Sequence, residues 1–451
     1  MRFQNRRSTH FAGGNFDESI VCAQYTFSGS TVFGADGGLL MHQPAANYPE
    51  TVLYARAPSL DPSASELPKR SGRVRFLDGI RGMAALYVVI HHAYLEAAVQ
   101  DQFKDIVHRL GPLTFLFDSG KLAVDIFIVL SGYSLMLPVV RAGGRIKSLS
   151  EFVRRRSMRI LPPYYAAVLL SLALIAWVPG LNHRTGAHWD SSLPAFETGP
   201  IVSHLLMIHD LSQGWAYRIN HALWSVATEC QIYVLFPLLM LPLWRRFGLA
   251  AMIVGSLCVT VPLGYLRPDL TAGRLWYAGL FALGAAGAVV ATSSDTGAKH
   301  LRTRVPWLAL AGVSIAAAVP LLAARDWVRG NAWIADLFIG ISTTCLIIAC
   351  AYTPPTGSSV ARELLRKLFE SRVATTLGLF SYSLYLIHPP IIAICNQWLS
   401  TTGLAPVYYL LTMLVIGTAA SVAAGGAFYW AIERWCVPPL KPYQQRNEPV
   451  P

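Results

Sequence analysis

Arg81 and His92 lie in the apolar stretch 79–99, and their types and spacing could do chemistry together. In an α-helix they are separated by about 1100°, about 20° from three whole turns, so they share a face and lie roughly 16 Å apart along the axis. His91 points about 80° away. A guanidinium binds anions and an imidazole exchanges protons near neutral pH. The spacing favours His92 as the working imidazole and predicts a long ligand between the two side chains.

Three more ionisable residues are predicted to lie at the depth of His92 in a bilayer: Asp125, Glu229 and His388. Counted from the predicted span ends, all four groups fall roughly 18–20 Å from the inner face of a core of about 30 Å. Such groups avoid lipid by facing inward and pairing, so we expect a shared polar chamber. Two prolines follow His388, and broken helices often line cavities. A hydrogen-bonded histidine at a kink is the alternative.

The two carboxylates are candidates for a supporting role. A carboxylate bonded to one ring nitrogen of His92 would orient the ring and stabilise the imidazolium. Glu229 is slightly favoured over Asp125, because Lys121 lies one turn before Asp125 and the two could simply neutralise each other. Two aromatic residues are candidates either for lining the chamber or for packing: Tyr233 and Tyr385.

Four arginines open the segment that begins near residue 154. The excess of basic residues in cytoplasmic loops explains at least Arg154 and Arg155. Arg156 and Arg159 lie three residues apart on one helical face, and guanidinium groups bind phosphate through paired hydrogen bonds. This pair is therefore a candidate anion site.

The elements that must position these residues are membrane spans. The chain has 451 residues and is 53% hydrophobic and only 14% charged, whereas a soluble protein carries about a quarter charged residues. Repeated apolar runs of about twenty residues predict an all-α, multi-pass membrane protein. The ten predicted spans are 79–99, 117–138, 160–179, 222–244, 248–266, 274–292, 306–324, 333–353, 375–399 and 405–432.

Loop charge predicts the orientation. With the N-terminal segment inside, the inner loops hold 16 Lys and Arg and the outer loops 8, so we expect both termini in the cytoplasm and the protein in the plasma or inner membrane. Residues 1–72 read as a disordered tail, and 438–451 as a short cytoplasmic tail. The net charge of +12 belongs to these loops and does not indicate nucleic acid.

Five motifs follow one another between residues 73 and 437. They are Arg81 with His92, VDIFIVLSGY at 124–133, RRRSMRILPPYY at 154–165, LWSVATECQIYVLFP at 223–237 and SYSLYLIHPP at 381–390. Together they resemble the acyltransferase-3 family of integral-membrane, acyl-CoA-dependent O-acyltransferases. The resemblance covers the whole membrane region, 73–437.

The resemblance implies roles for these residues. It assigns His92 the part of general base and Arg81 that of donor binding, and Arg156 and Arg159 match a paired arginine motif of the family. Many members have a second acid after Glu229, where this chain has Cys230. The implied reaction moves an acyl group, most often acetyl, from acyl-CoA on the cytoplasmic side to a hydroxyl of a carbohydrate or glycosylated acceptor. Acyl-CoA is a co-substrate, and no tightly bound cofactor is expected.

Several alternatives stay open at this stage. The acceptor could be a small molecule such as a macrolide, or the chain could transport acylated or glycosylated lipids without catalysis. Direct transfer is preferred over a relay across the membrane. The segment 180–221 is rich in histidine, including His183, His188, His204 and His209, but the spacings match no strong ligand pattern, so no metal site is expected. The sequence does not indicate an oligomeric state.

Overall fold

A computed structural model of the chain describes residues 74–100, 114, 117, 119–267, 274–323, 325–352 and 359–436. The two tails predicted from the sequence, 1–72 and 438–451, lie outside these residues. Within the described ranges every regular element is a helix, in agreement with the all-α prediction.

The helices follow one another in chain order. From the N-terminus they are α1 (Arg75–Ala98), α4 (Lys121–Arg141), α5 (Leu149–Trp177), η3 (His188–Ser192), α6 (Thr198–Leu205), η4 (His209–Leu211), α7 (Trp224–Leu235), η5 (Phe236–Met240) and α8 (Leu241–Leu266). They continue as α9 (Tyr277–Thr292), α10 (Thr296–Arg304), α11 (Trp307–Ala323), α12 (Arg325–Ala351), α13 (Val360–Phe369), α14 (Arg372–Leu379), α15 (Ser381–Ser400), α16 (Pro406–Thr412), η7 (Met413–Gly417), α17 (Thr418–Phe428), η8 (Tyr429–Glu433) and α18 (Arg434–Cys436).

The protein is a multi-pass membrane protein. Among the described residues, five helices are long and apolar enough to cross a membrane, or up to seven if each sharply bent pair forms one span. Each of the ten predicted ranges overlaps a helix or a run of helices. Two predicted spans, 222–244 and 248–266, form one helical run from Trp224 to Leu266, which Gly248 interrupts with a φ of 87°. The predicted span 375–399 is a pair, α14 and α15, bent by 75°.

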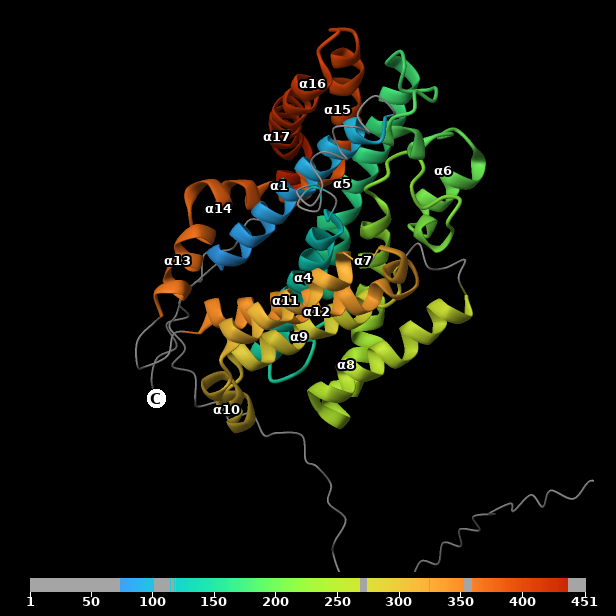
Figure 1. The fold of residues 1–451 in the computed structure, drawn as a ribbon. Coiled ribbons are helices and arrows are strands. Elements are labelled where there is room, and N and C mark those ends of the chain that lie inside the picture. The colour runs from blue at the N-terminus through green and yellow to red at the C-terminus, as the bar shows by residue number, and fades with distance from the viewer. Residues whose placement is uncertain are drawn as a thin grey trace, which may run out of the picture. The chain divides into compact units, whose positions relative to one another are not determined.

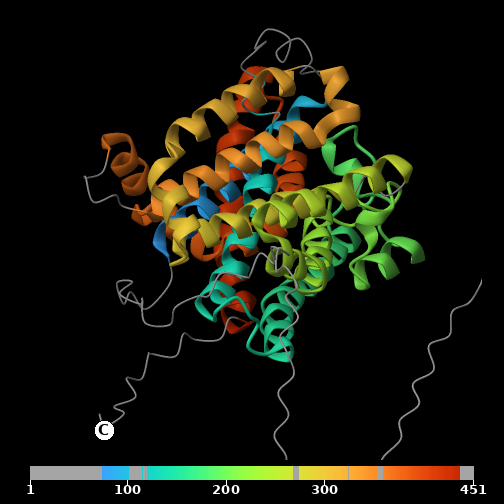
Figure 2. The same cartoon turned by 90° about the horizontal axis from the view of Figure 1, so that it is seen from below.

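Helix α1 runs unbroken from Arg75 to Ala98 and packs against α4, α14 and α15 (Figure 1). Its continuity preserves the geometry that the spacing of Arg81 and His92 predicts. The yellow and orange helices α9, α11 and α12 run side by side (Figure 2), and α9 packs closely on α4.

The crossing of α4 and α9 depends on two glycines. A Cβ at Gly132 would lie 2.0 Å from the backbone oxygen of Phe281, and one at Gly284 would lie 1.9 Å from that of Val129. Small residues of this kind let membrane helices approach until their backbones touch. The contact fixes α4, which carries Ser131 and Ser134 to the site described next.

Candidate active site

A cavity opens among α1, α4, α5, α7 and α15. Six of the side chains singled out from the sequence line it: Arg81, Arg156, Arg159, Glu229, Tyr233 and Tyr385. Both candidate tyrosines are among these lining residues. His92, His388 and Asp125 are not among its lining residues.

Arg81 is held at the wall of this cavity by two neighbours. Its Nη2 donates to the hydroxyl of Ser134 on α4 at 2.6 Å, and its Nη1 lies 3.6 Å from Oδ1 of Asp78 one turn earlier. The positive charges of Arg156 and Arg159 are close enough to repel that of the Arg81 guanidinium. Because one ion pair and one hydrogen bond leave most of its five N–H donors free, Arg81 can still bind an anion.

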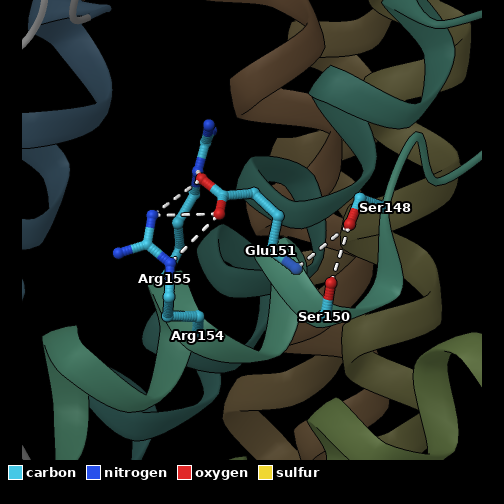
Figure 3. Close-up of polar contacts among 5 residues, drawn as sticks. All are labelled: Ser148, Ser150, Glu151, Arg154 and Arg155. Atoms are coloured by element: carbon cyan, nitrogen blue, oxygen red, sulfur yellow. Dashed lines mark hydrogen bonds and ion pairs between the residues drawn. The ribbon is translucent and has the colours of Figure 1, made fainter.

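The arginines at the start of α5 divide into two pairs. Arg154 and Arg155 are exposed and both bond to Glu151, which the Ser148 hydroxyl caps from before the helix (Figure 3). Arg156 and Arg159 are half-buried, line the cavity and form no ion pair with a described residue. The guanidinium of Arg156 lies over the ring of Tyr233, with Cζ 5.8 Å from its centroid. Of the four arginines, only Arg156 and Arg159 therefore lie at the cavity.

Glu229 lies in the cavity wall but does not reach His92. Its carboxylate accepts hydrogen bonds from the hydroxyls of Ser131 and Tyr233, and Ser131 and Tyr233 are themselves 2.8 Å apart. Its charge also acts on Arg156. The expected pairing of Glu229 with His92 is therefore wrong, because α7 turns the carboxylate toward α4 and the arginines.

Asp125 belongs to a different polar cluster. It is fully buried beside Asp336, Arg274 and Lys121. Lys121 Nζ lies 3.6 Å from Asp336 Oδ1, and Arg274 Nη1 lies 3.2 Å from Asp336 Oδ2. The expected catalytic role of Asp125 has no support in this geometry, since the residue packs against α12 rather than against His92. Sequence reasoning missed Asp336, which comes close to Asp125 only through tertiary packing.

His388 takes the position expected for the carboxylate, and two prolines hold it there. Pro389 and Pro390 have no N–H, so the carbonyls of Tyr385 and Leu386 lose their helical partners although α15 continues through them. The Tyr385 carbonyl accepts a hydrogen bond from Nδ1 of His388 at 2.8 Å, and the Leu384 carbonyl lies 3.2 Å from the same nitrogen. A carbonyl only accepts, so Nδ1 of His388 carries the proton and Nε2 is left as an acceptor.

The tautomer of His92 follows from this bond. Nε2 of His388 lies 2.9 Å from Nδ1 of His92. Because the His388 nitrogen accepts, Nδ1 of His92 is the donor and its Nε2 keeps a free lone pair. The sequence of α15 thus determines which nitrogen of His92 can take a proton.

Two further histidines from the connection between α5 and α7 face His92. The ring centroids of His221 and His188 lie 4.9 Å and 5.7 Å from that of His92, and 4.6 Å from each other. Asn220 anchors this segment, because its Nδ2 donates to the Leu386 carbonyl at 2.9 Å. Pro390 leaves the Leu386 carbonyl without a helical partner, and this carbonyl then binds Asn220 of the connection.

The histidines of the connection are held in the neutral form. Burial lowers the pKa of His188 to about 4. Burial, and then the neighbouring imidazoles of His188 and His388, lower the pKa of His221 well below its usual range. At neutral pH both rings therefore present lone pairs rather than positive charge.

Comparison with known proteins identifies the family of the chain. A family model described as an acyltransferase domain, acyltransferase-3, matches residues 74–430. The chain belongs to the acyltransferase-3 family. It is accordingly a membrane acyltransferase that transfers groups other than aminoacyl groups. No solved structure matches.

Distant curated relatives share this acyltransferase-3 region. The putative peptidoglycan O-acetyltransferase YrhL of Bacillus subtilis is 26% identical over 76% of this chain and 52% of its own length. Acyltransferase MdmB of Streptomyces mycarofaciens is 25% identical over 82% of this chain and 93% of its own. O-acetyltransferase OatA of Staphylococcus aureus is 24% identical over 77% of this chain and 55% of its own. The chain thus spans about half the length of YrhL and OatA.

Sequence reasoning missed the histidines that the acyltransferase-3 fold gathers around His92. His188 was noticed only as part of a histidine-rich segment, and His221 carried no motif of its own. The one usable signal was the pair of prolines after His388, because carbonyls without helical partners require donors from elsewhere in the chain.

Proposed function

We propose that this acyltransferase moves an acyl group, most often acetyl, from acyl-CoA to a hydroxyl of a carbohydrate or glycosylated acceptor, with His92 as the general base. The observation that carries the proposal is the bond between His388 and His92. It leaves the lone pair of His92 Nε2 free, on the helix that also brings Arg81 to the cationic cavity.

Acyl-CoA fits the cavity by charge. Arg81, Arg156 and Arg159 bring three positive charges to one wall, against the carboxylates of Glu229 and Asp78. Phosphates bind such guanidinium clusters through charge-assisted hydrogen bonds. With its phosphates at the arginines, coenzyme A would extend its pantetheine arm along α1 toward His92, roughly 16 Å away.

The chemical step needs one proton acceptor. As the acceptor hydroxyl attacks the thioester carbonyl carbon, its proton passes to Nε2 of His92. The carbon–sulfur bond then breaks, and the coenzyme A thiolate leaves and takes the proton from the imidazolium. The ester and free thiol are the products, and His92 returns to its neutral form. His388 acts as a positioning residue throughout, because its Nε2 holds the other nitrogen of the His92 ring.

A second pocket, on the connection between α5 and α7, is suited to bind a polar acceptor. It is lined by residues of the connection between α5 and α7: Arg184, Asp190, Ser191, Gln213, Tyr217 and Arg218. Helix η3 supplies Asp190 and Ser191 to this pocket and His188 to the histidines beside His92. Polar and partly exposed aromatic side chains of this kind suit the hydroxyls and faces of a sugar. A small hydroxylated acceptor, such as a macrolide, would use the same pocket.

The proposed orientation places both termini in the cytoplasm. Arg81 lies in the second turn of α1, and Arg156 and Arg159 lie in the third and fourth turns of α5, in its N-terminal half. The excess of basic residues predicts that these ends face inward, on the side where acyl-CoA is made. The connection with the second pocket would then face the outer side.

Two measurements test the proposal. Purified protein in detergent should release coenzyme A from acetyl-CoA only when a suitable hydroxyl acceptor is added. Mass spectrometry of cell-surface glycans and secreted metabolites, with and without the gene, should show one acetyl increment and so identify the acceptor. Turnover with an amine acceptor alone, or hydrolysis that no hydroxyl compound stimulates, would contradict it.

A further inference from the structure

Three imidazoles converge beside the proposed base in a way that general-base catalysis does not require. One ring nitrogen from each of His92, His188 and His221 lies within 4.8 Å of the others. Tetrahedral Zn²⁺ holds imidazole nitrogens at about 2.0–2.1 Å, which sets them about 3.4 Å apart. The nitrogens therefore lie at most about 1.4 Å farther apart than around a bound ion.

The second nitrogen of two of these rings is already held. Nδ1 of His92 donates to His388, and Nδ1 of His221 lies 3.3 Å from the hydroxyl of Ser192, which can accept its proton. Metal-binding histidines use this arrangement, because a partner on one nitrogen fixes the tautomer and aims the other nitrogen at the ion.

The nitrogen of His221 left for a ligand is otherwise unsatisfied. Nε2 of His221 is buried and has no hydrogen-bond partner among the described residues, and the residue is only 5% exposed. An unpaired buried nitrogen of this kind is destabilising, because it has lost its water and gained no partner. A cation held between the three rings would satisfy it, and imidazole nitrogens suit divalent transition metals such as Zn²⁺.

We propose that His92, His188 and His221 form a binding site for a divalent transition metal of the Zn²⁺ class, and that the bound metal inhibits acyl transfer. The metal takes the lone pair on Nε2 of His92, which is the one that accepts the proton of the attacking hydroxyl. Metal and proton therefore compete for one nitrogen. Binding of the metal is independent of the proposed function, whereas the inhibition rests on it.

The test titrates Co²⁺ into chelator-treated protein in detergent. We expect one equivalent to bind with the visible absorption of tetrahedral cobalt, and Zn²⁺ to displace it. His188→Asn and His221→Asn should each weaken binding on the order of 100-fold, and Ser192→Ala about 10-fold. The control is His183→Asn, since His183 is an exposed histidine of the same connection whose one hydrogen bond to a described residue is with Asn182. It should bind cobalt as the wild type does.

A second readout separates the two proposals. Micromolar Zn²⁺ should inhibit acyl transfer by the wild type and by His183→Asn, and His188→Asn should be resistant. Thermal unfolding of the metal-free variants verifies that each is folded. Cobalt binding that His188→Asn and His221→Asn leave unchanged would overturn the metal site even if acyl transfer proceeds as proposed. Binding as expected, without inhibition, would overturn the inhibitory role of the metal and leave the site in place.

Discussion

Helix α1 contributes to two different regions: Arg81 to the cavity lined by the three arginines, and His92 to the cluster that it forms with His188, His221 and His388. The two regions work by opposite physical means. In the cavity, Arg81, Arg156 and Arg159 gather positive charge that only an anion can balance. Beside His92, the buried rings of His188 and His221 are kept neutral, so that they offer lone pairs instead of charge. Binding of the donor and transfer of the proton are thus assigned to two different regions along α1. Changes in one region should therefore affect binding, and changes in the other should affect turnover.

The largest expected effect is on the KM for acyl-CoA, when the arginines of the cavity are replaced. The double variant Arg156→Gln with Arg159→Gln should raise the KM for acyl-CoA by at least about 100-fold, because each lost charge-assisted bond costs about 1.5–3 kcal/mol. The matched control is Arg154→Gln with Arg155→Gln, whose guanidinium groups are exposed and bonded to Glu151. It should change KM less than about threefold. Equal effects of the two pairs would show that general surface charge attracts the donor.

The other half of the comparison is tested at His388. His388→Phe removes the acceptor for Nδ1 of His92 and should lower kcat about 10- to 100-fold, with the KM for acyl-CoA unchanged. His388→Gln, whose amide can both donate and accept, should recover part of the loss. Steady-state kinetics of the three proteins separate kcat from KM. A KM effect of the same size as the kcat effect would mean that the two regions are not distinct.

The backbone contact between α4 and α9, at Gly284 and Val129, should affect stability. Gly284→Val forces a side chain against the carbonyl of Val129 and should destabilise the protein by about 1–3 kcal/mol. The control is Gly426→Val, since an added Cβ there meets nothing within 4 Å. Thermal unfolding in detergent should show a lower midpoint for Gly284→Val only. The opposite order would mean that α4 and α9 do not cross as described.

The smallest effect concerns the connection that carries the histidines. Asp210 is fully buried and bonds to Thr228 and Gln231, and burial raises its pKa to about 6. The folded state therefore binds a proton that the unfolded state releases, so this contribution to stability is present at low pH and is lost as pH rises through 6. Lowering the pH from 7 to 5 should stabilise the wild type by about 1 kcal/mol relative to Asp210→Asn. Parallel pH profiles of unfolding for the two proteins would refute the assignment.

The sequence predicted those parts of the molecule that depend on local periodicity. The apolar runs predict the helices, the spacing of Arg81 and His92 predicts their shared face, and the spacing of Arg156 and Arg159 predicts that both lie on one side of α5. These relations follow from 3.6 residues per turn and need no knowledge of what packs against the helix.

The partners of His92 could not be predicted in this way. His388 lies 296 residues away along the chain, and His188 and His221 reach the site through an irregular connection. Depth counting placed several ionisable groups in one layer, but it gives no position around the helix bundle. For that reason it could not separate Glu229, which faces the arginines, from His388, which faces the base.

The central claim is that the free nitrogen of His92 takes the proton of the acceptor. The most direct test measures acyl transfer from labelled acetyl-CoA by the wild type and by His92→Ala, with donor binding followed in the same samples. We expect transfer to fall by about 10²- to 10⁴-fold while acetyl-CoA binding stays within a few-fold of the wild type. Transfer at the wild-type rate by a folded, donor-binding His92→Ala protein would contradict the account.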